Sequence, residues 1–222
     1  MTLLEMRALF RDLIFDKAPS AEPFDNDGID RLLNAAMFNV YNLARALQRS
    51  LFLKRCTVTV NTSSGDALAF VSPPAPLTRV KKLLHARRLG DPGGTCPVRE
   101  YAATLNQATG APRDFPPCCL YNEGIAIIDP PVGAIDYAFD YLFGLPKMTH
   151  DTNTPGQTGA SNEGQADALP VEYHPMLVVK AAVMALKAEN APGWQALLSE
   201  YADQKETLVA SLQDRDDTAE NG

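Results

Sequence analysis

One apolar stripe constrains the fold of this chain more than any other feature of its sequence. Between residues 29 and 53 there is no proline, and apolar side chains recur three and four positions apart, which is the spacing of one helix face. The stripe includes Ile29, Leu33, Met37, Val40 and Leu51. It predicts a helix roughly 37 Å long, with Asp27 as its N-cap. Because such a helix cannot cover its own apolar face, other elements must pack against it.

Three further helices are predicted near the two ends of the chain. Thr2 and Glu5 form a capping box at the start of a helix that ends near Asp16. A helix rich in small apolar residues begins near Glu172, and Pro192 with Gly193 separates it from a fourth helix. Because each helix needs a partner, we expect residues 1–54 and 170–213 to form one helical bundle. This predicts an α+β fold in which the bundle carries an inserted antiparallel β region over 55–146.

Within the β region, the period of the apolar pattern changes from helical to alternating. Residues 56–60 and 67–71 predict a first hairpin around a turn at 63–66, and residues 119–122 and 125–129 predict a second hairpin. Residues 135–142 alternate between aromatic and polar side chains, as in a strand with one wet face. Residues 78–89 fit either a strand or a helix, and residues 98–108 fit a short helix or an irregular connection.

Two segments contain almost no apolar side chains. Residues 147–169 are rich in Thr, Gly, Asn, Gln and Asp, and we expect them to form a flexible loop. Residues 214–222 are expected to be a mobile acidic tail, because they offer little that could be buried against the rest of the chain.

Charge and composition exclude several classes of protein. The net charge is −7, which argues against a protein that coats nucleic acid. Residues 1–120 hold 15 basic and 11 acidic residues, whereas residues 121–222 hold 5 basic and 16 acidic residues. The first 15 residues are interrupted by charges, unlike a signal peptide, and no apolar run is long enough to span a membrane. Cys56, Cys96, Cys118 and Cys119 lack metal-ligand spacing, so we expect reduced, buried thiols.

The chain contains no recognisable reaction centre. It has no nucleophile elbow, P-loop or dinucleotide-binding motif. Asp136 and Asp140 lie on one face of a predicted strand but about 13 Å apart, too far to act together on one bond. His174 has no partner at metal spacing and fits the flank of a helix. We therefore expect no catalytic residue, no metal and no cofactor, and we expect the protein not to be an enzyme.

A cluster of basic residues is the better candidate for a contact with a partner. It consists of Arg79, Lys81, Lys82, Arg87 and Arg88. Five positive charges within ten residues suit phosphates or an acidic protein surface, although they also suit a solvated face. No aromatic residue lies among them, so stacking on bases is not indicated.

Several short motifs follow one another along the chain. The stripe contains Leu32, Leu33, Asn34 and Ala36, and the β region contains a Gly-x-Pro element, Gly110 to Pro112. The strand at 125–129 ends in Pro130 and Pro131. The aromatic strand leads to Pro146 and to a loop with Asp151, Thr152, Asn153 and Thr154. The third helix is preceded by Leu169, Pro170, Glu172, Tyr173 and His174.

In this order of motifs, from about residue 3 to 212, the chain resembles the head-to-tail adaptor proteins of tailed bacteriophages. Two parts depart from the family pattern. Residues 155–168 look like an insertion, and the basic segment 78–89 replaces the usual strand after the first hairpin. Both departures lie in segments that could contact partners.

The resemblance implies a structural protein of the virion neck, made in the cytoplasm of the host bacterium. It implies a ring, expected to hold twelve copies, that joins the portal protein to a tail or nozzle protein. Genomic DNA would pass through the ring without sequence-specific binding, and an acidic wall would repel its phosphates. Closed rings need heterologous contacts between subunits. Besides the basic cluster, candidate partner residues lie in the tail: Asp214, Arg215, Asp216, Asp217 and Glu220.

Three other classes stay open. The chain could be another neck or tail-completion protein of a phage with a different symmetry. It could be a nucleic-acid-binding regulator that uses residues 79–88, which would need a basic recognition helix. It could also be an enzyme of a chemistry that the motifs do not reveal.

Overall fold

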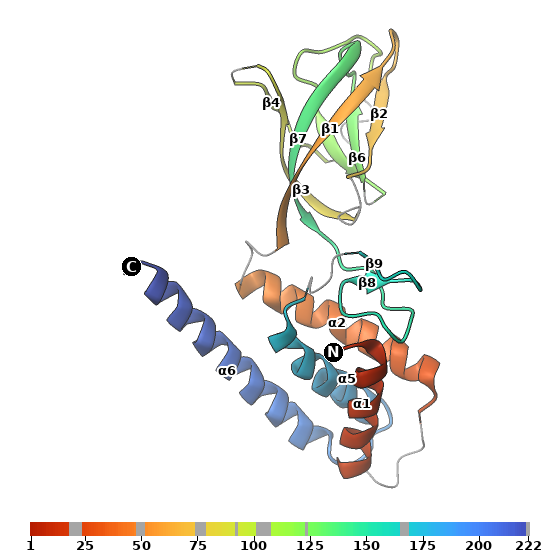
Figure 1. Cartoon of the computed structure of the whole chain (residues 1–222), viewed down its shortest axis with the longest axis vertical. Coiled ribbons are helices and arrows are strands. Elements are labelled where there is room, and N and C mark those ends of the chain that lie inside the picture. Colours follow the sequence, from red (N-terminus) through yellow and green to blue (C-terminus); the bar gives the residue numbers. More distant parts are fainter. Residues whose placement is uncertain are drawn as a thin grey trace. The chain divides into compact units, whose positions relative to one another are not determined.

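The computed structural model describes residues 1–17, 24–47, 52–73, 79–91, 93–100, 108–122, 124–164 and 169–220, with side chains described as far as residue 210. These residues form four α-helices, two antiparallel sheets and a short two-stranded ladder, which makes the chain an α+β protein (Figure 1). The chain divides into two compact units. The helical unit comprises Met1–Arg49 and Leu145–Gly222, and the β unit comprises Ser50–Gly144.

Helix α1 spans Leu3–Lys17 and starts at the predicted capping box. The Thr2 amide donates to Glu5 Oε2 at 2.8 Å, and the Glu5 amide donates to Thr2 Oγ1 at 3.3 Å. These two bonds satisfy amides that the first helical turn leaves free. The buried apolar face consists of Leu3, Met6, Phe10 and Ile14.

Helix α2 spans Asn26–Leu47 and buries the predicted stripe from Ile29 to Ala44. The predicted cap is wrong. The cap is Asp25, whose Oδ1 accepts the Gly28 amide at 2.7 Å, whereas Asp27 lies within the first turn. The helix is described to Leu47, residues 48–51 lie outside the described residues, and strand β1 begins at Leu53.

Helix α5 forms the centre of the helical unit. A 3-10 turn at Val171–Tyr173 leads into α5, which spans His174–Ala188, and Pro175 lies in its first turn, where a proline is tolerated. Helices α1, α2 and α6 all contact α5. Alanines at three buried positions, Ala181, Ala182 and Ala185, permit this close packing. His174 is also buried, and its Nε2 lies 2.8 Å from the Leu169 carbonyl oxygen, a structural role at the helix start.

Helix α6 spans Trp194–Glu220, after the predicted break at Pro192 and Gly193. We expected the helix to end near residue 213 and to give way to a tail. Instead, the helical backbone continues through residues 214–220, so the predicted end was wrong. The sequence there lacks proline and glycine, and nothing in it stops the helix before Glu220.

The β unit contains two antiparallel sheets. The four-stranded sheet has the order β1-β7-β3-β4. Its strands are β1 (Leu53–Thr62), β7 (Gly133–Phe143), β3 (Val80–Arg88) and β4 (Thr95–Cys96). The three-stranded sheet has the order β2-β6-β5, with strands β2 (Leu68–Val71), β6 (Gly124–Ile128) and β5 (Cys118–Tyr121). The ambiguous segment 78–89 is thus largely strand β3, while residues 101–107 of the segment 98–108 lie outside the described residues.

The two predicted hairpins had different outcomes. The second is confirmed, since β5 pairs with β6 from Cys118 opposite Ile127 to Tyr121 opposite Gly124. The first is wrong, because β1 pairs with β7 and β2 pairs with β6, in different sheets. The turn between them does form, and the Ser63 amide donates to Asp66 Oδ2 at 2.6 Å. A turn therefore connects the two strands without pairing them.

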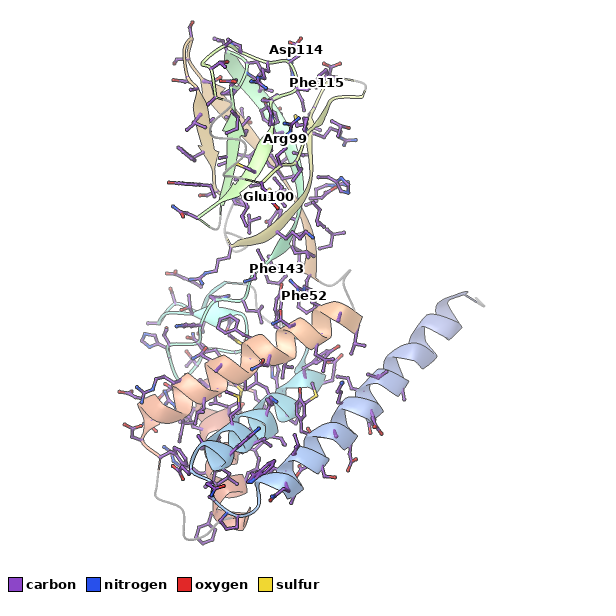
Figure 2. The ribbon with its side chains drawn as sticks, turned by 180° about the vertical axis from the view of Figure 1, so that it is seen from behind. Phe52, Arg99, Glu100, Asp114, Phe115 and Phe143 are labelled. Carbon is purple, nitrogen blue, oxygen red and sulfur yellow. The ribbon has the colours of Figure 1, made fainter. Side chains whose placement is uncertain are left out.

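The two sheets pack against each other and bury one face of each. Strand β3 contacts β5 and β6, and β1 contacts β2. The buried residues include Tyr137, Phe139 and Tyr141 from β7, Ile125 and Ile127 from β6, and all four cysteines, which are free thiols as predicted. Phe52 and Phe143 extend this core at one end of β1 and β7, with ring centroids 6.1 Å apart (Figure 2).

The polar segment after β7 is held by a network of hydrogen bonds around one buried side chain. Asn153 Oδ1 accepts the amides of Thr149 and His150 at 2.9 and 2.8 Å, and its Nδ2 donates to the Gly159 carbonyl at 2.8 Å. A short ladder of β8 (Gln157–Thr158) and β9 (Glu163–Gly164) lies beyond it. The segment expected to be a structureless loop therefore has defined structure in its described part, to residue 164.

Candidate interaction surface

The four-stranded sheet presents a polar face to solvent. Alternation along β7 places Asp136 and Asp140 on this face and the aromatic residues on the buried one. The register places Thr59 opposite Asp136, and both Arg55 and His85 opposite Asp140. We define the polar sheet face as Arg55, Thr57, Thr59, His85, Arg87, Asp136 and Asp140. It carries charges of both signs within a few residues of one another.

Arg55 and Asp140 form a bidentate ion pair on the polar sheet face. Arg55 Nε and one Nη donate to the two carboxylate oxygens of Asp140 at 2.5 and 2.8 Å. Hydrogen bonding from Arg55, with smaller contributions from the charges of His85 and Arg87, lowers the pKa of Asp140. The same carboxylate raises the pKa of Arg55. Both groups are therefore charged throughout the physiological pH range.

Thr59 and Asp136 form a second cross-strand contact, in which the Thr59 hydroxyl donates to Asp136 Oδ1 at 2.6 Å. Arg55 and Thr59 were not among the predicted site residues. The alternation of residues 56–60 indicated their side of the strand, but their partners depend on the pairing of β1 with β7, which the sequence did not reveal.

The basic cluster lies on or beside strand β3. Lys81, Lys82 and Arg87 are exposed, whereas Arg79 and Arg88 are half-buried. Arg88 Nη1 lies 3.4 Å from the Asp114 carbonyl oxygen, and Asp114 and Phe115 lie at the opposite end of the β unit from Phe52 and Phe143 (Figure 2). The cluster is therefore spread along a strand and divided between exposed and partly covered positions. It does not form one compact cationic site.

The acidic candidates lie at the end of α6. The backbone of Asp214, Arg215, Asp216, Asp217 and Glu220 is helical, and their side chains lie outside the described residues. The structure thus does not bring them together with the basic cluster in one described site.

A buried carboxylate organises another part of the β unit. Asp129 Oδ1 accepts the amides of Thr109 and Gly110 at 2.9 and 2.8 Å, and Arg113 forms an ion pair with Oδ2 at 3.0 Å. Thr109, Gly110 and Arg113 all belong to the β unit itself. The site therefore fixes the Gly-x-Pro segment beside the end of β6, a structural task.

The described residues contain no group of three or more His, Cys, Asp or Glu side chains placed to hold a metal ion. In the part of the chain that the structure describes, no helix is long and apolar enough to cross a membrane. The polar sheet face can form salt bridges and hydrogen bonds with a protein or with phosphates.

No model of a known protein family matches the chain, and a search of curated proteins found no relative.

Proposed function

We propose that this chain is a structural adaptor of the neck of a tailed bacteriophage. In this proposal, about twelve copies form a ring beneath the portal protein, and the ring joins the genome-filled head to a tail or nozzle protein. The four helices act as one bundle, and the β unit is the insertion that faces the tail. DNA passes through the ring without being held, because the net charge of −7 opposes binding of phosphates.

One observation supports the proposal most. Residues of the motifs that carry the resemblance make tertiary hydrogen bonds in this fold, which supports reading the order of the motifs as a structural signature. Asn34 binds both backbone groups of Met148, two residues after Pro146. In the same way, Asp129 binds Gly110 of the Gly-x-Pro element and directly precedes Pro130.

The alternative of a nucleic-acid-binding regulator has less support. It needs a basic recognition helix, whereas the basic cluster lies on strand β3 and the residue before it. The described polar sheet face also holds Asp136 and Asp140 close to its cations, which lowers its attraction for phosphates.

Assembly without the chain tests the proposal. In the virus that encodes it, particles made in its absence should be DNA-filled heads without tails, and adding the purified chain should restore tail attachment. Substitutions in the exposed turn at 63–66 should preserve portal binding and reduce tail attachment. Tailed particles formed without the chain would refute the adaptor role, and normal attachment with the altered turn would refute the orientation of the β unit.

A further inference from the structure

Strand β1 lies at an open edge of the four-stranded sheet. It has one neighbour, β7, with an unbroken register from Leu53 opposite Leu142 to Thr62 opposite Gly133. Strand β2 is likewise at the edge of its sheet and pairs with β6. Figure 1 shows β1 and β2 beside each other, and a groove of about 390 Å³ is lined by residues of both strands.

The hydrogen bonds of β7 show which backbone amides and carbonyls of β1 point outward at this edge. The Asp136 carbonyl accepts the Leu89 amide at 2.8 Å, and the Gly144 amide donates to the Arg79 carbonyl at 2.8 Å. Even-numbered residues of β7 therefore direct their backbone groups toward β3, and odd-numbered residues direct theirs toward β1. The register then leaves the amides and carbonyls of Thr57, Thr59 and Asn61 pointing away from β7. No strand among the described residues pairs with them.

The two edges of the four-stranded sheet differ in how well they are protected against pairing with another strand. Strand β4 covers β3 only at Ala86 and Arg87. The rest of the β3 edge carries Lys81 and Lys82, and its pairing with β7 has two register shifts. Lysines and bulges at a strand edge prevent another strand from pairing there. In β1, residues 56–62 contain no charge, no proline and no register shift.

We propose that the open edge of β1 binds an extended segment of a partner protein as an additional strand. Thr57, Thr59 and Asn61 supply the backbone donors and acceptors, which fit a segment of about five to seven residues. Phe70, which is 58% exposed, is the one exposed large apolar side chain among the described residues that line the groove, since Val60 and Val71 beside it are buried. The groove therefore favours a segment without proline that is held mainly by its backbone and places one apolar side chain against Phe70. The inference does not rest on the neck assignment.

The structure favours a lone segment over a second copy of this chain. Strand β2 lies along the same groove, whose volume of about 390 Å³ suits the side chains of one added strand. A second copy that paired through its own β1 would also bring its β2 and its three-stranded sheet to the groove. The groove, which suits one strand, would not hold them. A second copy that offered its β3 edge would bring Lys81 and Lys82 toward Lys54 and Arg55 of β1, where like charges repel.

Peptide selection tests the proposal. A yeast-displayed library of random ten-residue peptides is selected on the intact chain, and the affinity of an enriched synthetic peptide is measured by fluorescence anisotropy.

Three variants of Thr59 test whether the peptide pairs with β1. Thr59→Pro removes the outward amide without removing a bond to β7, and should weaken binding about tenfold or more. Thr59→Val is the matched control, because it removes the same hydroxyl and keeps the amide, so binding should change by less than about twofold. Thr59→Lys, which protects the edge as the lysines protect β3, should likewise weaken binding about tenfold or more.

Amide exchange then locates the peptide. The expected result is slower exchange at Thr57, Thr59 and Asn61 when the peptide is bound, with enriched peptides that lack proline and carry an apolar residue. Circular dichroism confirms that each variant is folded, and Thr59→Lys decides the question if Thr59→Pro unfolds. The proposal is overturned if no peptide is enriched, if the folded Lys variant binds normally, or if protection appears elsewhere. Self-association of the chain through this edge, without peptide binding, would replace the partner segment by a second copy.

Discussion

The side-chain amide of Asn34 pairs with the backbone of Met148 in both directions. Asn34 Oδ1 accepts the Met148 amide at 2.8 Å, and Nδ2 donates to the Met148 carbonyl at 3.0 Å. Both residues are buried, so water cannot replace these bonds easily. The contact fastens the segment after β7 to the middle of α2.

Asn34→Leu should therefore destabilise the protein by about 3 kcal/mol, because it leaves a buried amide and a buried carbonyl without partners. Urea denaturation followed by circular dichroism measures the free energy of unfolding. Asn39→Ala is the matched control. The exposed Asn39 side chain donates to the Ala35 carbonyl at 3.0 Å, just as Asn34 donates to the Asp30 carbonyl at 2.9 Å, but Asn39 holds no buried segment. Asn39→Ala should lower the free energy of unfolding by no more than about 0.5 kcal/mol. Equal costs for the two variants would contradict the role of Asn34.

The pairing of Arg55 with Asp140 predicts a pH dependence of stability. The folded pKa of Asp140 is lowered, so the pair stabilises the protein above the unfolded pKa of an aspartate, about 3.9. This contribution declines as the pH falls through the folded pKa. Asp140→Asn should lower the thermal midpoint at pH 7, and the gap to the wild type should close in acid. Because Arg55 is largely exposed, 1 M salt should narrow the gap at neutral pH. A gap that keeps its full size as the pH falls from 7 into acid would contradict this account.

Truncation tests the position of α5 at the centre of the helical unit. Among the described helices, α1, α2 and α6 all contact α5, so a chain ending at residue 168 leaves the apolar faces of α1 and α2 uncovered. We expect an insoluble product, or one that retains helical circular dichroism without a cooperative thermal transition. A truncated chain that unfolds cooperatively would show that α1 and α2 do not need α5.

The end of α6 should change on binding the portal. Residues 214–220 hold four acidic side chains and one arginine, which suits a basic groove on the partner. These residues are the last turns of α6 and hold no large apolar side chain, so the helix should open readily there and amide exchange should be fast in the free protein. Exchange should be slower in the portal complex, and fast again when salt weakens the contact. Equally fast exchange in both states would mean that this end serves only solubility.

Much of the fold could be predicted because burial of one face of a helix or strand gives its sequence a regular spacing of apolar residues. The stripe of α2, the small residues of α5, the alternation of β7 and the hairpin of β5 and β6 were all predicted. Each of these elements is amphipathic or wholly buried, so local pattern and final environment agree.

The remaining features depend on contacts that a local pattern does not encode. Alternation in β1 defines which side chains face inward, yet it does not define whether β2 or β7 is the neighbour. Strand β3 was ambiguous because its two register shifts interrupt the alternation between Val80 and His85. Asn153 organises its loop through bonds to the backbone, so composition alone made the loop look structureless.

The candidate interaction surface was likewise predictable only in part. The basic cluster was visible as a run of charges, but its split into exposed and half-buried residues follows from the alternation and packing of β3. Arg55 became a site residue only through its partner Asp140, 85 positions away in the sequence.

The mass of the assembled complex tests the adaptor proposal most directly. The purified chain is measured by native mass spectrometry alone and after mixing with the portal ring of the virus that encodes it. The account predicts a saturable complex with one chain of 24.1 kDa per portal subunit, about twelve in a dodecameric ring. The portal ring at its own mass, with the chain remaining free at every concentration tested, would contradict it.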